Sequence, residues 1–344
     1  MINARILLVV LLGIVGLASS PVVEASGIRY ETIGEIRLSG AGGSVVGGSD
    51  YRAAATRGGY IYVVSGGERL SVFDGRGVAS ASGSALIVEP TCEMMLDFGN
   101  PVGLLLVGDR LYCYGWEGGE VLDVSDPSSP VRTGFFGDRG THIFQMVHHD
   151  GYLVAACHDR LILYSLAMNA DYPTVVKDLP MEADTYVYSV CVIGERLCAA
   201  GFRKRQTGET AYWLGSWDFS TPERTALLRT VRTDERGYRL ISLDGLLLAI
   251  SENRTELWRV DEAAPSFIES VSVCGRAVAR DGGIAVLDEV ALDATDGRIE
   301  VVGRVDCPED RCHTGLPRLG ATADGLVILP RTSSIAILRR TASD

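Results

Sequence analysis

The sequence predicts an all-β fold, a seven-bladed β-propeller in which each blade is a four-stranded antiparallel sheet. Three observations lead to this prediction. The chain after residue 25 shows little helical periodicity, short runs rich in Val, Ile, Leu and Tyr alternate with Gly and Asp turns, and these runs recur as a unit. Runs of this length and composition are typical of short antiparallel strands.

The repeating unit begins with an apolar run, a tight turn and a second apolar run, and we find seven such units. Successive turns lie 37 to 51 residues apart, which fits the period of about 40–50 residues for a propeller blade. Four of the seven turns are Asp-Gly, and glycine tolerates the positive φ of a two-residue hairpin. The turns are Gly58-Gly59, Asp109-Arg110, Asp150-Gly151, Glu195-Arg196, Asp244-Gly245, Asp281-Gly282 and Asp324-Gly325.

Each unit continues with a third apolar run, and most units have a fourth. The third runs are Arg69–Asp74, Glu120–Ser125, Leu161–Leu166, Tyr212–Phe219, Glu256–Asp261, Val290–Ala294 and Ser334–Arg339. The fourth runs are Pro130–Gly137, Pro173–Leu179, Thr225–Val231, Ser266–Val273 and Arg298–Val305. Four runs in a unit correspond to the four strands of a propeller blade.

The two ends of the repeat are complementary. The last unit stops after its third run, whereas an extra run, Tyr30–Leu38, precedes the first unit. We therefore expect this N-terminal strand to complete the last blade by pairing with Ser334–Arg339, which removes an exposed sheet edge. The alternative is an open or six-bladed arrangement.

Residues 1–25 have the layout of a secretory signal peptide. Arg5 precedes an apolar run over residues 6–15, and Val23-Glu24-Ala25 resembles a small-residue cleavage site. The alternative is an uncleaved membrane anchor, although the run is shorter than the ~20 residues of a spanning helix. We expect residues 26–344 to form a single propeller domain that is secreted, periplasmic or on the cell surface, with no transmembrane segment in the mature chain.

The net charge of −12 argues against two classes of partner. An acidic protein repels nucleic acid and anionic lipid, so neither is an expected ligand. The partners that remain are a polar small molecule, a glycan or a protein. No cofactor is predicted, because no phosphate-binding glycine loop, Cys-x-x-Cys pair or calcium loop occurs in the sequence.

One unit resembles a known repeat. Gly108–Tyr114, followed by Gly119–Val131 with its Leu-Asp-Val-Ser-Asp-Pro-Ser-Ser-Pro sequence, is similar to the LVIVD repeat. The other units match only in their turns and apolar pattern. The resemblance implies a secreted or surface propeller and transfers no catalytic residue. The corner at Asp126 needs no function, because an aspartate accepts hydrogen bonds from backbone two residues on and proline presets the turn.

Three histidines are predicted to share the face at the mouth of the central channel. His142 and His313 lie in loops between blades, and His158 lies between the second and third strands of its blade; loops of both kinds lie on one face of a propeller. Ligand sites favour such convergent loops. We expect a binding module that recognises its ligand there. The alternative is a secreted hydrolase or lyase with a His/carboxylate site that acts either by acid/base chemistry or through a divalent metal. Charged candidates on the same face are Asp138, Arg139, Asp159, Asp310 and Arg311.

Two pairs of cysteines are disulfide candidates in an exported chain. Cys307 and Cys312 bracket a short loop, and Cys191 and Cys198 flank a hairpin turn. A one-residue change in that hairpin's register would separate the second pair. The sequence does not assign Cys92, Cys113, Cys157 or Cys274. It also shows a basic insertion, Phe202–Thr210, which is either a contact for an anionic polymer or a plain hairpin extension.

Overall fold

The fold is described by a computed structural model. It describes residues 28–36 and 51–342, apart from 66–67, 77–89, 139, 235–238, 252, 262–263, 274, 276, 288–289, 295–296, 307–317, 324–325 and 331–334. In these ranges nearly every element is a β-strand, and the exception is a short 3-10 helix, η2 (Pro222–Arg224). No helix in the described part of the chain has the length and apolar character to cross a membrane.

Four groups of strands form separate antiparallel sheets of four strands each. The first two groups are β6 (Pro101–Val107), β7 (Arg110–Gly115), β8 (Gly118–Asp123) and β9 (Val131–Phe136), then β10 (Ile143–His149), β11 (Tyr152–Cys157), β12 (Arg160–Ser165) and β13 (Thr174–Pro180). The next two are β14 (Thr185–Ile193), β15 (Arg196–Lys204), β16 (Thr210–Asp218) and β17 (Ala226–Thr233), then β18 (Arg239–Leu243), β19 (Leu246–Ile250), β20 (Thr255–Val260) and β21 (Pro265–Val271).

Three further groups of four antiparallel strands are joined into one sheet of 13 strands. They are β2 (Tyr51–Arg57), β3 (Tyr60–Ser65), β4 (Arg69–Asp74) and β5 (Cys92–Met95); β22 (Ala277–Asp281), β23 (Ile284–Leu287), β24 (Val290–Asp293) and β25 (Glu300–Asp306); and β27 (Ala321–Ala323), β28 (Leu326–Pro330) and β29 (Ile335–Ala342) with β1 (Ile28–Ile36). The joins are short parallel contacts, in which β1 meets β25 and β26 (Arg318–Leu319) bridges β22 and β2. The sequence predicts that each blade is a separate four-stranded sheet. These three groups differ from that prediction, because short parallel contacts join them into one sheet.

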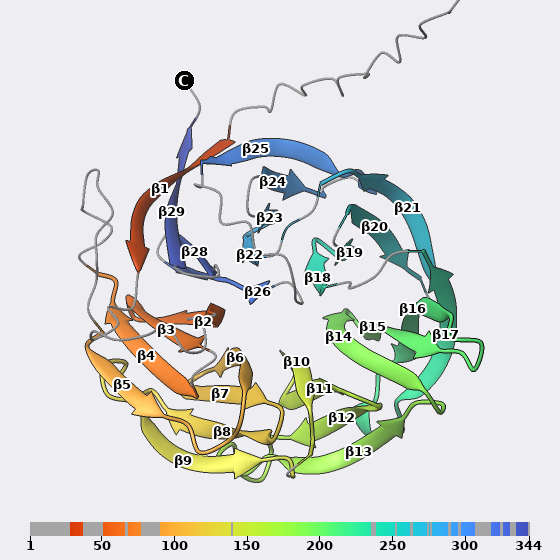
Figure 1. The fold of residues 1–344 in the computed structure, drawn as a ribbon, viewed down its shortest axis with the longest axis horizontal. Helices are drawn as coiled ribbons and strands as arrows, with labels where there is room; N and C mark the ends of the chain where they lie inside the picture. Colours follow the sequence, from red (N-terminus) through yellow and green to blue (C-terminus); the bar gives the residue numbers. More distant parts are fainter. Residues whose placement is uncertain are drawn as a thin grey trace, which may run out of the picture.

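The groups follow one another around a ring, with the first strand of each nearest the centre and the last at the outside (Figure 1). This arrangement is that of a β-propeller, so the predicted all-β propeller fold is confirmed. The fourth strand of the first unit, β5, had no counterpart in the sequence prediction. Its residues Cys92-Glu93-Met94-Met95 pair with β4 but lack an apolar run.

The N-terminal strand lies where the sequence places it. β1 pairs antiparallel with β29, with Tyr30 opposite Arg340 and Ile36 opposite Ile335. Tyr30 is fully buried, and its hydroxyl donates a hydrogen bond to Asp281 Oδ2 at 2.7 Å. The predicted pairing of the two ends of the chain is confirmed.

The hydrophobic core lies between the groups. Each of seven apolar clusters in the described residues joins one group to its neighbour in the ring. One cluster packs Ile61 and Phe73 of β3 and β4 against Ile328 and Ile337 of β28 and β29, across the point where the ring closes. Because every group buries both faces on its neighbours, inner strands such as β3, β7 and β11 read as nearly continuous apolar runs.

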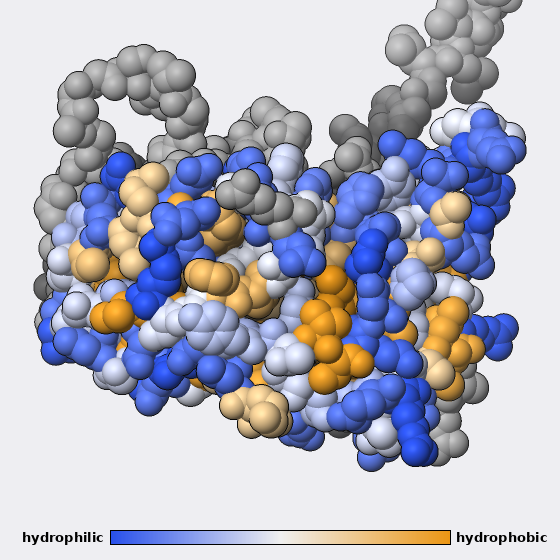
Figure 2. Space-filling model, turned by 90° about the horizontal axis from the view of Figure 1, so that it is seen from below, coloured by the Kyte–Doolittle hydropathy of each residue, from blue (hydrophilic) through white to orange (hydrophobic). Residues whose placement is uncertain are grey.

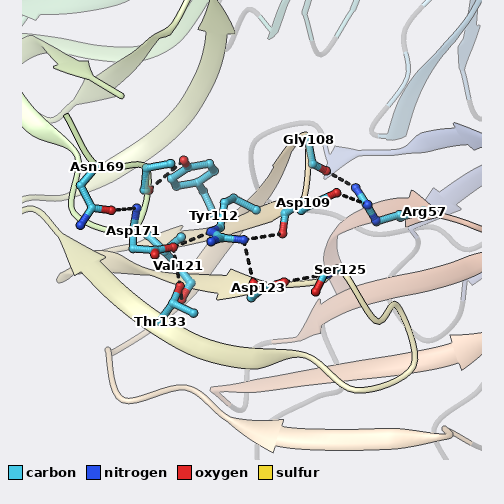
Figure 3. Close-up of polar contacts among 12 residues, drawn as sticks. Arg57, Gly108, Asp109, Tyr112, Val121, Asp123, Ser125, Thr133, Asn169 and Asp171 are labelled. Atoms are coloured by element: carbon cyan, nitrogen blue, oxygen red, sulfur yellow. Dashed lines mark hydrogen bonds and ion pairs between the residues drawn. The ribbon is translucent and has the colours of Figure 1, made fainter. Parts of the chain in front are cut away.

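Polar contacts tie neighbouring groups together at the end of the ring where first strands turn into second strands. Arg57 donates hydrogen bonds to Gly108 O and Asp109, and Tyr112 Oη donates to Ala170 O at 3.0 Å (Figure 3). Arg110 pairs both with Asp123 of its own group, at 2.8 Å, and with Asp171 of the next group. These contacts fix the first three groups against one another.

Candidate functional site

The opposite end of the ring carries two kinds of connection. Antiparallel strands alternate in direction, so the turn from second to third strand and the loop from a fourth strand to the next group lie at the same end. Trp116 lies in a turn of the first kind, and His142 lies in a loop of the second kind, just before β10. This end is the predicted channel-mouth face.

His142 and His158 are neighbours on this face. The amide of His158 donates a hydrogen bond to His142 O at 3.1 Å, and the two rings meet edge to face with centroids 6.0 Å apart. The backbone contact follows from the fold, because the turn between β11 and β12 lies beside the loop that enters β10. The sequence prediction that these two residues lie together is therefore confirmed.

Aromatic rings surround this histidine pair on both sides. Trp116 stacks on His142 with centroids 5.7 Å apart and an angle of 18° between the rings. Tyr186, near the start of β14, meets His158 edge to face at 4.4 Å, and Phe202 near the end of β15 stacks on Tyr186 at 4.6 Å. We call these five residues the aromatic row. The row runs across three consecutive groups of strands.

The aromatic row is accessible to a partner. The Trp116 side chain is 45% exposed, His158 is exposed, and His142, Tyr186 and Phe202 are half-buried. Offset-stacked and edge-to-face geometries are the arrangements that aromatic pairs prefer, so the row forms a preorganised surface.

A cation lies at one end of the aromatic row. Lys204 Nζ is 5.4 Å from the centroid of the Tyr186 ring. A cation–π contact of this kind contributes about 0.5–1 kcal/mol at an exposed site. The row therefore ends in a positively charged side chain that is itself available to a ligand.

The predicted charged residues are less closely joined to the histidines. Asp159 forms an ion pair with the adjacent Arg160 at 2.8 Å, and that hydrogen bond holds the pKa of Asp159 below its usual value. The backbone amide of Asp138 donates to Thr141 Oγ1 at 3.2 Å, which orders the loop before His142. Arg139, Asp310, Arg311 and His313 lie outside the described residues.

The described residues contain no group of three or more His, Cys, Asp or Glu side chains able to hold a metal ion. Among the described residues, the His142 and His158 rings contact other aromatic rings. Trp116, Tyr186 and Phe202 are not among the site residues that the sequence predicts. A signal was present in the turn Gly115-Trp116-Glu117-Gly118, where a large aromatic residue occupies a short exposed loop.

One disulfide prediction is wrong, and the other cannot be compared. Cys191 and Cys198 are directly opposite in the ladder of β14 and β15, as the hairpin turn predicts, but both thiols are free. They are buried in an apolar cluster with Tyr188 and Leu240, where a thiol packs as a small apolar group. Burial raises the pKa of Cys191 to about 12. The pair Cys307 and Cys312 lies outside the described residues.

The comparisons with known proteins bear on the fold. No protein-family model matches this chain, and no curated protein matches it. The N-terminal domain of Nup159 is similar in structure, with a TM-score of 0.54 and 10% identity over 92% of this chain and 96% of that one. A chain in the structure of S. cerevisiae Dbp5 bound to Nup159, Gle1, IP6 and ADP has a TM-score of 0.56 and 11% identity, over 92% and 96% of the two chains. A chain of the mitotic checkpoint complex has a TM-score of 0.62 and 10% identity, over 98% and 99%. At these identities, the likeness establishes a shared fold alone.

Proposed function

We propose that this chain is an extracytoplasmic protein-binding module, a seven-bladed propeller that contacts its partner through the aromatic row. The observation that carries the proposal is the continuous series of ring contacts from Trp116 to Phe202 across three groups of strands. Exposed tryptophan and tyrosine side chains are enriched at protein interfaces and contribute much of their binding energy.

Three features support the proposed blade count and location. Seven apolar clusters that join consecutive groups support a ring of seven blades, because a ring has as many interfaces as blades. The apolar run at residues 6–15 after Arg5 supports export. The similarity of Gly119–Val131 to the LVIVD repeat supports the same location.

A protein is the preferred partner among the three classes that the sequence leaves open. The described contacts of the aromatic row offer large, weakly polar surfaces and one lysine, rather than several convergent hydrogen-bonding groups of the kind that orient a small polar ligand. Two of the structurally similar chains belong to complexes of several proteins. The likeness establishes only that the folds are similar. We use it as support for the proposal that this chain also takes part in protein interactions.

The test compares two double variants of the full chain. Trp116→Ala with His158→Ala removes the two most exposed rings of the aromatic row. The matched control, Phe135→Ala with Tyr172→Ala, removes an exposed edge-to-face pair from the outer side of the ring. The partner is isolated from the host cell envelope by cross-linking to the wild-type chain, purified, and titrated calorimetrically with all three proteins.

We expect the aromatic-row variant to bind at least about tenfold more weakly, because loss of a hot-spot side chain costs ~2 kcal/mol and 1.4 kcal/mol corresponds to a factor of ten. The control should keep the wild-type affinity, and both variants should keep the wild-type melting temperature. Equal affinity of the wild type and the aromatic-row variant would remove the proposed site.

A further inference from the structure

A groove of about 480 Å³ lies on the outer side of the ring, between two consecutive groups of strands. One wall is the end of β13, and the other is formed by β16 and β17 of the next group. Figure 2 shows the outer side of the ring in the direction of β9 and β13, where apolar patches lie between hydrophilic side chains. The groove has an apolar floor and a basic rim.

Two tryptophans of β16 form the floor of the groove. Trp213 and Trp217 are four residues apart on one strand, so they point to the same side of the sheet, with ring centroids 6.4 Å apart. Glycines make room for both indoles. A Cβ atom at Gly201 would lie 2.6 Å from Trp213 Cζ2, and one at Gly215 would lie 2.8 Å from Trp217 Cη2. The local sequence therefore allows each indole to lie directly over the backbone.

The apolar floor continues onto an exposed side chain. Leu227 of β17 is paired in register with Trp217, yet 55% of its side chain is exposed. The indole nitrogen of Trp213 is buried and has no hydrogen-bond partner among the described residues. An exposed leucine that extends a tryptophan-lined groove is typical of a surface that a partner covers.

The charges that line the groove are mainly positive. Arg203, Arg205 and Arg232 line it, with one acidic side chain, Glu182. Arg203 pairs with Glu182, and Arg205 lies 3.5 Å from Glu209. Arg232 is exposed and forms no ion pair with a described residue. A basic rim on a protein of net charge −12 is complementary to an acidic ligand.

Two of the three arginines of the basic rim, Arg203 and Arg205, come from the insertion at Phe202–Thr210. This segment continues the hairpin of β15 and β16, and the amide of Arg205 donates to Glu209 O at 2.8 Å across its turn. The insertion therefore continues the β15–β16 hairpin. The extension also brings Arg203 and Arg205 to the groove.

We propose that this groove binds an extended acidic segment of a partner protein. A bulky apolar side chain of that segment packs on Trp217 and Leu227, and flanking carboxylates pair with Arg232 and Arg205. The N-terminal apolar run of this chain is a poor occupant, because Arg5 is the only charged residue before Glu24. The inference does not rest on the proposed function of the aromatic row, since the two surfaces have no residue in common.

The experiment selects peptides from a phage-displayed library of random 12-residue sequences on the full chain. Selected peptides are synthesised with a fluorescent label, and their binding is measured by anisotropy. Two groove variants, Arg232→Glu and Leu227→Asp, are compared with two matched controls on the same strand, Arg229→Glu and Leu228→Asp. Both control residues are exposed, and neither lines the groove.

We expect the selected peptides to combine a Trp, Phe or Leu with two or more acidic residues. Arg232→Glu and Leu227→Asp should each weaken binding at least tenfold, the two controls should leave it unchanged, and added salt should weaken it.

Failure to enrich any peptide, enrichment of peptides without acidic residues, or equal loss in the groove and control variants overturns the proposal. A dimer of the wild type that Leu227→Asp converts to a monomer also overturns it, because a second copy would then be the occupant. The aromatic-row variant Trp116→Ala with His158→Ala should bind these peptides normally, which separates this test from that of the proposed function.

Discussion

Individual cysteines in this protein pack as apolar residues. Cys113 and Cys198 are completely inaccessible to solvent, and burial raises the pKa of each thiol well above its usual value. Cys92, on the outer strand β5, is half-buried. Reactivity requires the thiolate, so a buried thiol with a raised pKa is unreactive in the native state.

This difference predicts the order in which the thiols react. We expect iodoacetamide at neutral pH to modify Cys92 first and to leave Cys113, Cys191 and Cys198 unmodified, as measured by peptide mass spectrometry. Denaturation without a reducing agent should expose all of them to modification. Protection of Cys191 and Cys198 that persists in the denatured, unreduced protein would show that the two residues form a disulfide after all.

At the scale of elements, the turns that follow the third strands β8 and β16 share one hydrogen-bonding pattern. In each turn, an aspartate carboxylate accepts a hydrogen bond from a serine two residues later. The Asp123 carboxylate accepts a hydrogen bond from the amide of Ser125 at 2.7 Å, and Asp218 accepts one from Ser220 at 3.1 Å. Asp126 accepts bonds from both the amide and the hydroxyl of Ser128, at 3.0 and 2.7 Å. The bonds of Asp126 are the local turn chemistry that the Asp-Pro-x-x-Pro sequence predicts.

The hydrogen bonds in these turns predict how the free energy of unfolding depends on pH. The hydrogen bonds from Ser128 lower the pKa of Asp126, so the folded state binds a proton less readily than the unfolded chain does. The resulting stabilisation is complete above the usual pKa of 3.8 and is lost as the pH falls through the lower pKa of the folded state. Melting temperatures between pH 6 and pH 2 should therefore fall less steeply for Asp126→Asn than for the wild type. Identical curves for Asp126→Asn and the wild type would contradict the assignment.

Strand positions could be predicted because local patterns determine them. The third runs Arg69–Asp74 and Val290–Ala294 match β4 and β24 within one residue, since apolar runs and glycine turns mark their ends. The aromatic row could not be predicted in the same way. Tyr186 and Phe202 lie within ordinary apolar strands, and only the packing of one group on the next brings them to His158. The fold depends on repeated local signals, whereas the candidate site depends on contacts between blades.

At the scale of the whole molecule, the ring depends on one strand from the beginning of the chain. β1 is the outer strand of the group that otherwise contains only β27, β28 and β29 from the end of the chain. Its contacts are antiparallel with β29 and, over residues 28–31, parallel with β25 of the neighbouring group. The strand therefore joins the two ends of the chain and also links two groups in the ring.

Removal of β1 should destabilise the whole ring. A chain that starts at residue 37 loses the fully buried Tyr30 and leaves the edge of β29 unpaired. Loss of a buried aromatic side chain costs about 3–5 kcal/mol, which corresponds to a fall in melting temperature of roughly 10 °C in a domain of this size. An exposed strand edge also favours aggregation.

The matched control starts at residue 27, keeps β1, and should retain the melting temperature and the solubility of the full chain. Calorimetry and light scattering on both truncated chains measure these effects, and identical behaviour of the two would mean that β1 does not hold the ring closed.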